Sequence, residues 1–93
     1  MIASFRCRRT ADVFRGVAPK SFPGDILVAA RRKLRMLDAA ILLQDMKAPP
    51  ANRLEALAGN RRGQHSIRVN EQWRLCFIWR EGHAHEVEIV DYH

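Results

Sequence analysis

The spacing of hydrophobic residues changes near the middle of the chain, from a helical repeat to strict alternation. In the first half, apolar residues recur three or four positions apart, which is typical of a helix with one buried face. Pro23 and Asp25 suit the start of this helix, and Pro49–Pro50 must lie beyond its end. We therefore predict one main helix that begins near Pro23, with this apolar stripe: Leu27, Ala30, Leu34, Leu37 and Ile41.

A short strand and a short helix are predicted before the main helix. Met1–Cys7 reads as a strand with Ile2 and Phe5 facing inward. Thr10 suits the N-cap of a helix that Gly16 would end.

The second half predicts strands joined by short turns. Leu54 and Leu57 suit a short strand, and turns are expected at 70–72 and at 81–82. Short turns favour antiparallel pairing, so the chain predicts an α+β fold in which helices cover one face of an antiparallel sheet. The alternating residues expected to face the core are Ile67, Val69, Trp73, Leu75, Phe77, Trp79, Val87 and Ile89.

The composition of the 93-residue chain fits one small domain over residues 1–93. Lysine and arginine number 16 against 10 acidic residues, and this net charge of +6 favours RNA or DNA as a partner over an anionic membrane. The same charge would also serve solubility alone. No transmembrane segment or signal peptide is recognisable, and two unpaired cysteines fit a reducing cytoplasm. No cofactor is expected, and no metal, because neither cysteine has metal-ligand spacing with the histidines.

Arg74 is the chemically unusual residue of the alternating region. It should project from the sheet face opposite Trp73, together with Arg68, Glu86 and Glu88. One interpretation is a network of cross-strand salt bridges. The other is a guanidinium group directed at a phosphate. The pattern alone leaves both open.

The chain ends in Asp91–Tyr92–His93, three side chains capable of hydrogen bonding or proton transfer. Histidine serves as a general acid or base near neutral pH. RNA cleavage without a metal needs a base for the 2′-hydroxyl, a cation for the pentacovalent phosphate and an acid for the leaving oxygen. These residues and Arg74 could supply those roles.

Two further groups of arginines invite a role in binding. Arg61 and Arg62 lie in a basic, glycine-flanked loop that suits phosphate contact, although such loops are also common on protein surfaces. Arg31, Arg32 and Arg35 lie on the main helix, where they fit a solvated face, an RNA groove or the acidic surface of a partner protein.

Taken together, segments along nearly the whole chain resemble the HigB-type toxins of the RelE/ParE superfamily, and most closely their GraT-like branch. The most specific segments are Lys33–Ala40, Asn52–Gly63, His65–Asn70, Gln72–Phe77 and Asp91–His93. The resemblance implies a RelE-like fold and cleavage of messenger RNA, commonly on the ribosome. It also implies a helix-turn-helix antitoxin of the HigA type, through which the complex would bind its operator DNA.

The resemblance carries catalytic roles to Arg74, Asp91, Tyr92 and His93. Many relatives have a histidine at the position of Glu55 and a lysine where this chain has Ala58. Glu55 could act as a general base, because a carboxylate can do that work, or could equally be a surface residue. Arg61, Arg62 or Arg68 would then supply the missing cation. Arg31, Arg32 and Arg35 are the expected antitoxin contacts.

Two other functions compete with RNA cleavage. A toxin of the same fold could inhibit growth by binding the ribosome or another nucleic-acid target without cutting it, because fold does not fix the target. A generic basic interaction module is the third interpretation. Arg74 together with Asp91–Tyr92–His93 favours the nuclease.

Overall fold

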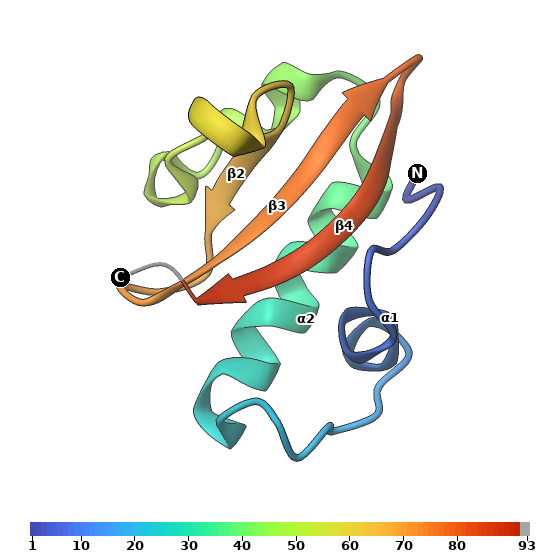
Figure 1. Ribbon diagram of the computed structural model, residues 1–93, viewed down its shortest axis with the longest axis vertical. Coiled ribbons are helices and arrows are strands. Elements are labelled where there is room, and N and C mark those ends of the chain that lie inside the picture. Colours follow the sequence, from blue (N-terminus) through green and yellow to red (C-terminus); the bar gives the residue numbers. More distant parts are fainter. Residues whose placement is uncertain (92–93) are drawn as a thin grey trace.

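The computed structural model describes residues 1–91, in which two α-helices cover one face of a four-stranded antiparallel sheet (Figure 1). The strand order is β1-β2-β3-β4. This arrangement confirms the α+β fold expected from the sequence. The helices are α1 (Arg8–Phe14) and α2 (Gly24–Ala39), and the strands are β1 (Glu55–Ala56), β2 (His65–Arg68), β3 (Trp73–Arg80) and β4 (His83–Asp91).

The long hairpin of β3 and β4 makes the most extensive strand pairing in the sheet, with β4 as the last strand in the order. Its two-residue turn consists of Glu81 and Gly82, whose φ angles are 54° and 80°. Two consecutive residues with positive φ give the turn a twist that matches the twist of the flanking strands. The turn predicted at 81–82 is confirmed.

A bulge interrupts the alternation along β4. The register shifts between Cys76 and Ile78, so that Phe77 faces two residues of β4 instead of one. Glu86 adopts a φ of 50° there, and its N–H donates to the Ser4 hydroxyl at 2.9 Å. Because of this extra residue, the buried side chains of β4 do not fall at every second position. They are Ala84, Val87 and Ile89.

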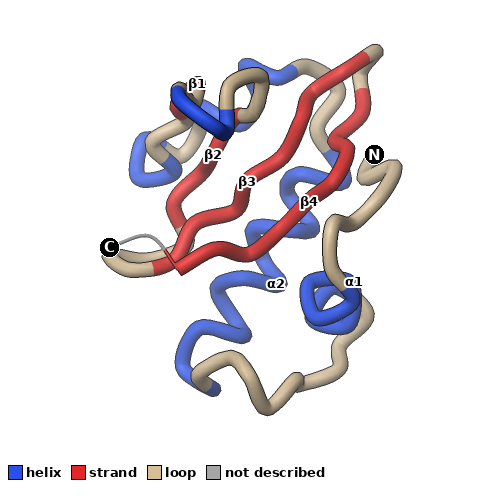
Figure 2. The backbone as a smooth tube through the Cα atoms, viewed as in Figure 1, coloured by secondary structure: helices blue, strands red, loops and turns tan. Residues whose placement is uncertain are grey.

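The N-terminal segment differs from the predicted strand. It contacts β4 through two isolated parallel bridges, Ile2 with Ala84 and Phe5 with Val87, and it runs beside that strand in Figure 2. Ile2 and Phe5 do pack against the core, as expected.

Thr10 was predicted as an N-cap, and that assignment is wrong. The N-cap of helix α1 is Cys7, three residues earlier, and Thr10 is fully buried inside the helix. Its hydroxyl accepts a hydrogen bond from the N–H of Ile89 at 3.0 Å, which ties α1 to β4. Gly16, with φ at 93°, lies just beyond the C-cap Arg15, as expected for a glycine that ends a helix.

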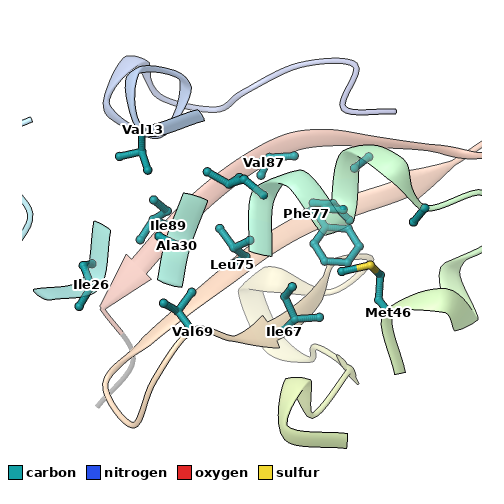
Figure 3. Close-up of a cluster of buried hydrophobic side chains, with 14 of the residues drawn as sticks. Val13, Ile26, Ala30, Met46, Ile67, Val69, Leu75, Phe77, Val87 and Ile89 are labelled. Carbon is teal, nitrogen blue, oxygen red and sulfur yellow. The ribbon is translucent and has the colours of Figure 1, made fainter. Parts of the chain in front are cut away.

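The core lies between the helices and the sheet (Figure 3). Helix α2 contributes a buried stripe that begins at Ile26 instead of Leu27, which is only partly buried. Ile41, predicted to continue this stripe, is 78% exposed because the helix ends at Ala39. The strands contribute fully or almost fully buried side chains, with Trp73 and Trp79 partly buried at the margin: Ile67, Leu75, Phe77, Ala84, Val87 and Ile89.

Two short 3-10 helices, Leu43–Lys47 and Pro50–Asn52, connect α2 to β1, and a third, Gly59–Arg61, lies between β1 and β2. The Asp45 carboxylate accepts hydrogen bonds from the N–H groups of Leu42 and Ile41, each at 2.9 Å. These two bonds lower the pKa of Asp45 and turn the chain away from α2. The second 3-10 helix leads directly into Arg53 and β1 and so positions one side of the candidate site.

Candidate active site

Arg74 lies on the sheet face opposite the helices and is 9% exposed. Its Nε donates to the hydroxyl of Ser66 at 2.9 Å, and a terminal nitrogen donates to the carbonyl of Arg53 at 2.8 Å. Trp73, the preceding residue, packs on the core side against Phe22. The prediction that Arg74 and Trp73 face opposite sides of the sheet is therefore confirmed.

Glu55 reaches the same guanidinium group from β1. It lies opposite Ser66 in the β1–β2 register, and its Oε2 is 3.9 Å from a terminal nitrogen of Arg74. About half of the Glu55 side chain is exposed, so water screens this ion pair. A carboxylate in this position can accept a proton beside the arginine, as a general base requires.

A buried asparagine fixes the backbone that leads to Arg53. The Nδ2 of Asn52 donates to the carbonyls of Met46 and Ala48 at 3.1 and 3.2 Å. Its Oδ1 accepts a hydrogen bond from the Nζ of Lys33 on α2. Asn52 is fully buried, so these bonds replace the water that its amide would otherwise bind. The carbonyl of Arg53, the next residue, is thereby held in place for Arg74.

The residue Lys33 is itself almost completely buried. Burial lowers its pKa below the ordinary value, and the charge of Arg32 lowers it further. The free energy cost of burying this amine is offset in part by its bond to Asn52.

A polar hollow of about 320 Å³ lies beside Arg74. Arg68 and Arg74 are directly opposite each other in the β2–β3 register. Like charges in that arrangement repel, and a bound anion would relieve the repulsion. Five side chains line the hollow: Arg53, Arg68, Asn70, Glu71 and Arg74.

The end of β4 brings Asp91 to the end of the sheet where Arg74 lies. Asp91 pairs with Trp73 and Val90 pairs with Arg74, so the register places Asp91 on the face of Trp73 and not on that of Arg74. The Nε2 of Gln72 donates to Oδ2 of Asp91 at 3.1 Å. Tyr92 and His93, the other predicted catalytic residues of this segment, lie outside the described residues.

The basic loop extends the positive surface along the open face. Arg61 is not isolated, because it bonds to Gln64 at 3.1 Å and to Glu88 at 3.3 Å. Arg6 approaches the same Glu88 carboxylate at 3.9 Å. Arg62 is exposed and forms no ion pair with any residue from 1 to 91.

Cys76 lies opposite Ser66 and Glu88 on this face but is fully buried. Burial raises the pKa of its thiol above the ordinary value. Both cysteines are unpaired, as expected. The buried neutral thiol of Cys76 is unsuited to act as a nucleophile.

The arginines of α2 lie on the other side of the molecule. Arg31 is partly buried, and its Nε donates to the carbonyl of Val13 at 3.0 Å. Arg32 and Arg35 are exposed. Together these three line a shallow groove of about 500 Å³ with the apolar side chains of Val28, Met36 and Ala39.

Among residues 1–91, no group of three histidine, cysteine, aspartate or glutamate side chains is arranged to hold a metal ion. No helix in that range is long and apolar enough to cross a membrane.

The structure adds Arg53, Ser66 and Asn70 to the residues predicted from the sequence. Ser66 could have been found, because period-two alternation places it on the face of Arg68 and Arg74. No sequence signal points to the carbonyl of Arg53, because every residue has a carbonyl and only the folded backbone directs this one.

Comparisons with known proteins place this geometry in a family. The family model described as "RelE-like toxin of type II toxin-antitoxin system HigB" matches residues 13–93. "Toxin HigB-1" of Vibrio cholerae serotype O1 is 52% identical over 62 residues, which are 67% of this chain and 65% of that relative, slightly less than two thirds of its length. "Endoribonuclease HigB" of Proteus vulgaris is 27% identical over the whole of both chains.

The fold also matches a solved structure. The YoeB–YefM complex from Staphylococcus aureus contains a chain that aligns with a TM-score of 0.62 and 15% identity, over 100% of this chain and 98% of that one. At this identity the likeness concerns the fold alone. With the family model covering most of the sequence, the chain belongs to the HigB family of RelE-like toxins of type II toxin–antitoxin systems.

Proposed function

We propose that this toxin is a metal-independent endoribonuclease that cleaves messenger RNA on the ribosome and thereby inhibits translation. The observation that supports this most directly is Arg74, a guanidinium group held beside Glu55 on the open face of the sheet. The name of the Proteus vulgaris relative, "Endoribonuclease HigB", agrees with this activity.

The proposed chemistry is attack of a deprotonated 2′-hydroxyl on the adjacent phosphate, which forms a 2′,3′-cyclic phosphate and breaks the bond to the 5′-oxygen, and this leaving oxygen takes up a proton. Arg74 stabilises the pentacovalent phosphate, because its planar fork of donors matches the phosphate oxygens. His93 acts as general acid or base, with Asp91 assisting the proton transfer and Tyr92 positioning the substrate. Glu55 is the alternative proton acceptor, and its distance of 3.9 Å from Arg74 supports that role.

The RNA strand would follow the positive surface around this centre. Arg68 lies opposite Arg74, and Arg62 extends the surface toward the loop. Arg61 would contribute less charge, because Glu88 already pairs with it. These three arginines are the proposed contacts to the RNA backbone.

The proposed regulator is a HigA-type helix-turn-helix antitoxin, and the toxin is proposed to act in the cytoplasm. The surface formed by Arg31, Arg32 and Arg35 on α2 would bind an acidic part of that partner. Operator DNA would be contacted through the antitoxin.

The test is to induce the toxin in cells and map new RNA ends across the transcriptome. Cuts within translated messages are expected for the parent, and their loss is expected for His93→Ala, since one proton-transfer group contributes about 10²- to 10⁴-fold in rate. Circular dichroism and antitoxin binding serve as folding controls. Growth arrest without new RNA ends would favour the alternative, a toxin that binds its target without cutting it.

A further inference from the structure

Arg53 contributes to the candidate site in two separate ways, through its backbone and through its side chain. Its carbonyl accepts a hydrogen bond from Arg74 at 2.8 Å. Its side chain is exposed and lines the hollow beside Arg74. Neither the sequence pattern nor the resemblance assigned a role to this residue.

The backbone conformation of Arg53 is unusual for a residue with a side chain. Its φ of 47° and ψ of 60° lie in the left-handed region, which glycine adopts more readily. The hydrogen bonds of Asn52, the preceding residue, hold the chain in this conformation. An arginine at a position that favours glycine invites a functional explanation for its side chain.

No structural partner explains that side chain. Among residues 1–91, neither Arg53 nor Arg68 makes a side-chain hydrogen bond or an ion pair within 4.0 Å. Both line the same hollow, whose described lining contains three arginines and a single carboxylate, Glu71. The lining is therefore positively charged, with Asn70 as a neutral hydrogen-bonding neighbour.

We propose that the hollow is a subsite for a backbone phosphate of single-stranded RNA, next to the phosphate that Arg74 contacts, and that the Arg53 side chain is its principal ligand. The chemistry of the lining suits a phosphodiester, because arginine offers paired donors to phosphate oxygens. This proposal rests on the proposed RNA substrate.

The experiment uses Arg53→Gly, which removes the side chain, keeps the carbonyl that holds Arg74 and suits the left-handed backbone. Arg80→Ala is the control for charge, because Arg80 is exposed at the opposite end of β3. Urea unfolding checks that both variants are folded. The probe is a short 2′-O-methyl RNA, which binds but cannot be cleaved, titrated over a range of salt concentrations.

Loss of one phosphate contact should reduce the slope of log affinity against log salt by about 0.7. For Arg53→Gly we expect this change together with roughly tenfold weaker binding at low salt, whereas Arg80→Ala should keep the parental slope. Equal slopes for Arg53→Gly and the parent, or equal losses in both variants, would overturn the proposal.

Cleavage kinetics separate this inference from the proposed function. Arg53→Gly should raise KM roughly tenfold and leave kcat nearly unchanged, because the contact exists in both the ground state and the transition state. A lower kcat at unchanged KM would refute a binding role for the side chain. If the parent bound the 2′-O-methyl RNA with the expected salt slopes but cut no unmodified RNA, either free or on the ribosome, the nuclease proposal would fail and the phosphate subsite would stand.

Discussion

Two neutral acceptors, a serine hydroxyl and a backbone carbonyl, help to orient Arg74. Neutral acceptors fix the guanidinium plane without cancelling its charge. Glu55 adds an ion pair at 3.9 Å that water screens, because the Glu55 side chain is half exposed. The planar fork of donors in Arg74 is thus held on the sheet face where a phosphate could bind.

Replacing Arg74 with alanine should reduce RNA cleavage by about 10²- to 10³-fold, as expected when a preorganised donor to the transition state is lost. Arg74→Lys keeps the charge but loses the planar fork, so it should recover only part of the rate. Rates are measured on purified protein whose circular dichroism matches the parent. A folded alanine variant with the parental rate would show that the catalytic centre lies elsewhere.

Ser66→Ala should weaken the orientation of Arg74 without removing any charge. The expected result is a lower kcat at nearly unchanged KM, with a loss of stability of about 1 kcal/mol from one hydrogen bond. Ser66→Thr, which keeps the hydroxyl, should restore the rate. If Ser66→Ala and Ser66→Thr were equally impaired, packing around Ser66 and not its hydroxyl would explain the loss.

The sequence predicted which side chains face outward more accurately than it predicted how they are held. Alternation placed Arg68 and Arg74 on one face because the side-chain period of a strand is two. The prediction of Thr10 as a helix cap was wrong, because a threonine near a helix start is a common cap and the long-range bond of Thr10 to Ile89 leaves no local trace in the sequence. The hydrogen bond between Arg74 and the carbonyl of Arg53 could not be predicted either, because it also joins residues that are far apart in the sequence.

Helix α2 supports the candidate site through one internal contact. Lys33 on α2 bonds to Asn52, and Asn52 fixes the backbone of Arg53, which in turn bonds to Arg74. This chain of contacts connects the helical layer to the open face of the sheet. Changes on α2 can therefore affect the orientation of Arg74 without touching it.

Lys33→Met should change how stability depends on pH. Burial lowers the pKa of Lys33 in the folded protein, so between that value and the ordinary 10.5 the unfolded chain binds a proton that the folded chain does not. The stability of the parent relative to Lys33→Met should therefore rise with pH through this window and level off above it. Urea unfolding at several pH values measures this difference.

Two points assign the pH-dependent difference in stability between the parent and Lys33→Met to the titration of Lys33. Cys76, whose pKa burial raises, destabilises the fold above its ordinary pKa in both proteins, so its effect cancels in the difference. Lys47→Met, at an exposed lysine, serves as the control for losing a surface charge. A difference between the parent and Lys33→Met that stayed constant with pH would contradict the assignment.

The turn between β3 and β4 offers a stabilising substitution. Glu81 has positive φ, and asparagine followed by glycine is the preferred pair for such a turn. Glu81→Asn should raise the free energy of unfolding by about 0.5–1 kcal/mol and the Tm by several degrees. Gly82→Ala should act in the opposite direction. An unchanged Tm in Glu81→Asn would mean that the turn is not strained.

Helices and strands were predicted well where hydrophobic residues recur at a regular spacing and poorly where that spacing is interrupted. The alternation of β3 was recognised directly. The bulge at Glu86 was missed because a positive φ at a glutamate has no sequence signature. Ile41 was assigned to the helical stripe because it lies four positions after Leu37, but the helix ends at Ala39 and the chain has already turned toward Asp45.

The two candidate surfaces of the molecule lie on opposite sides of the sheet. Arg74 faces away from the helices, whereas the groove containing Arg32 and Arg35 lies on α2. Substitutions could therefore change substrate binding and antitoxin binding independently of each other. An antitoxin bound at α2 would have to reach around the sheet, or add bulk, to prevent ribosome binding.

The double variant Arg32→Glu, Arg35→Glu should escape neutralisation by the antitoxin while keeping its cleavage rate. Reversing two charges at an interface with an acidic partner should weaken binding by roughly tenfold or more, and less at high salt. Arg80→Glu is the matched control. Calorimetric binding and growth in the presence of the antitoxin are the measurements; unchanged affinity would move the partner's contact away from α2.

The pairing of residues 1–6 with β4 also bears on the moment at which the toxin becomes active. Ala84 and Val87 exchange backbone hydrogen bonds with Met1, Ala3, Ser4 and Arg6. During synthesis the N-terminal segment must wait for β4, a strand that is made more than 80 residues later. A nascent chain in which β4 is still in the exit tunnel cannot complete the sheet or support Arg74. We therefore expect the toxin to gain its activity only after residues 83–91 have left the ribosome that makes it.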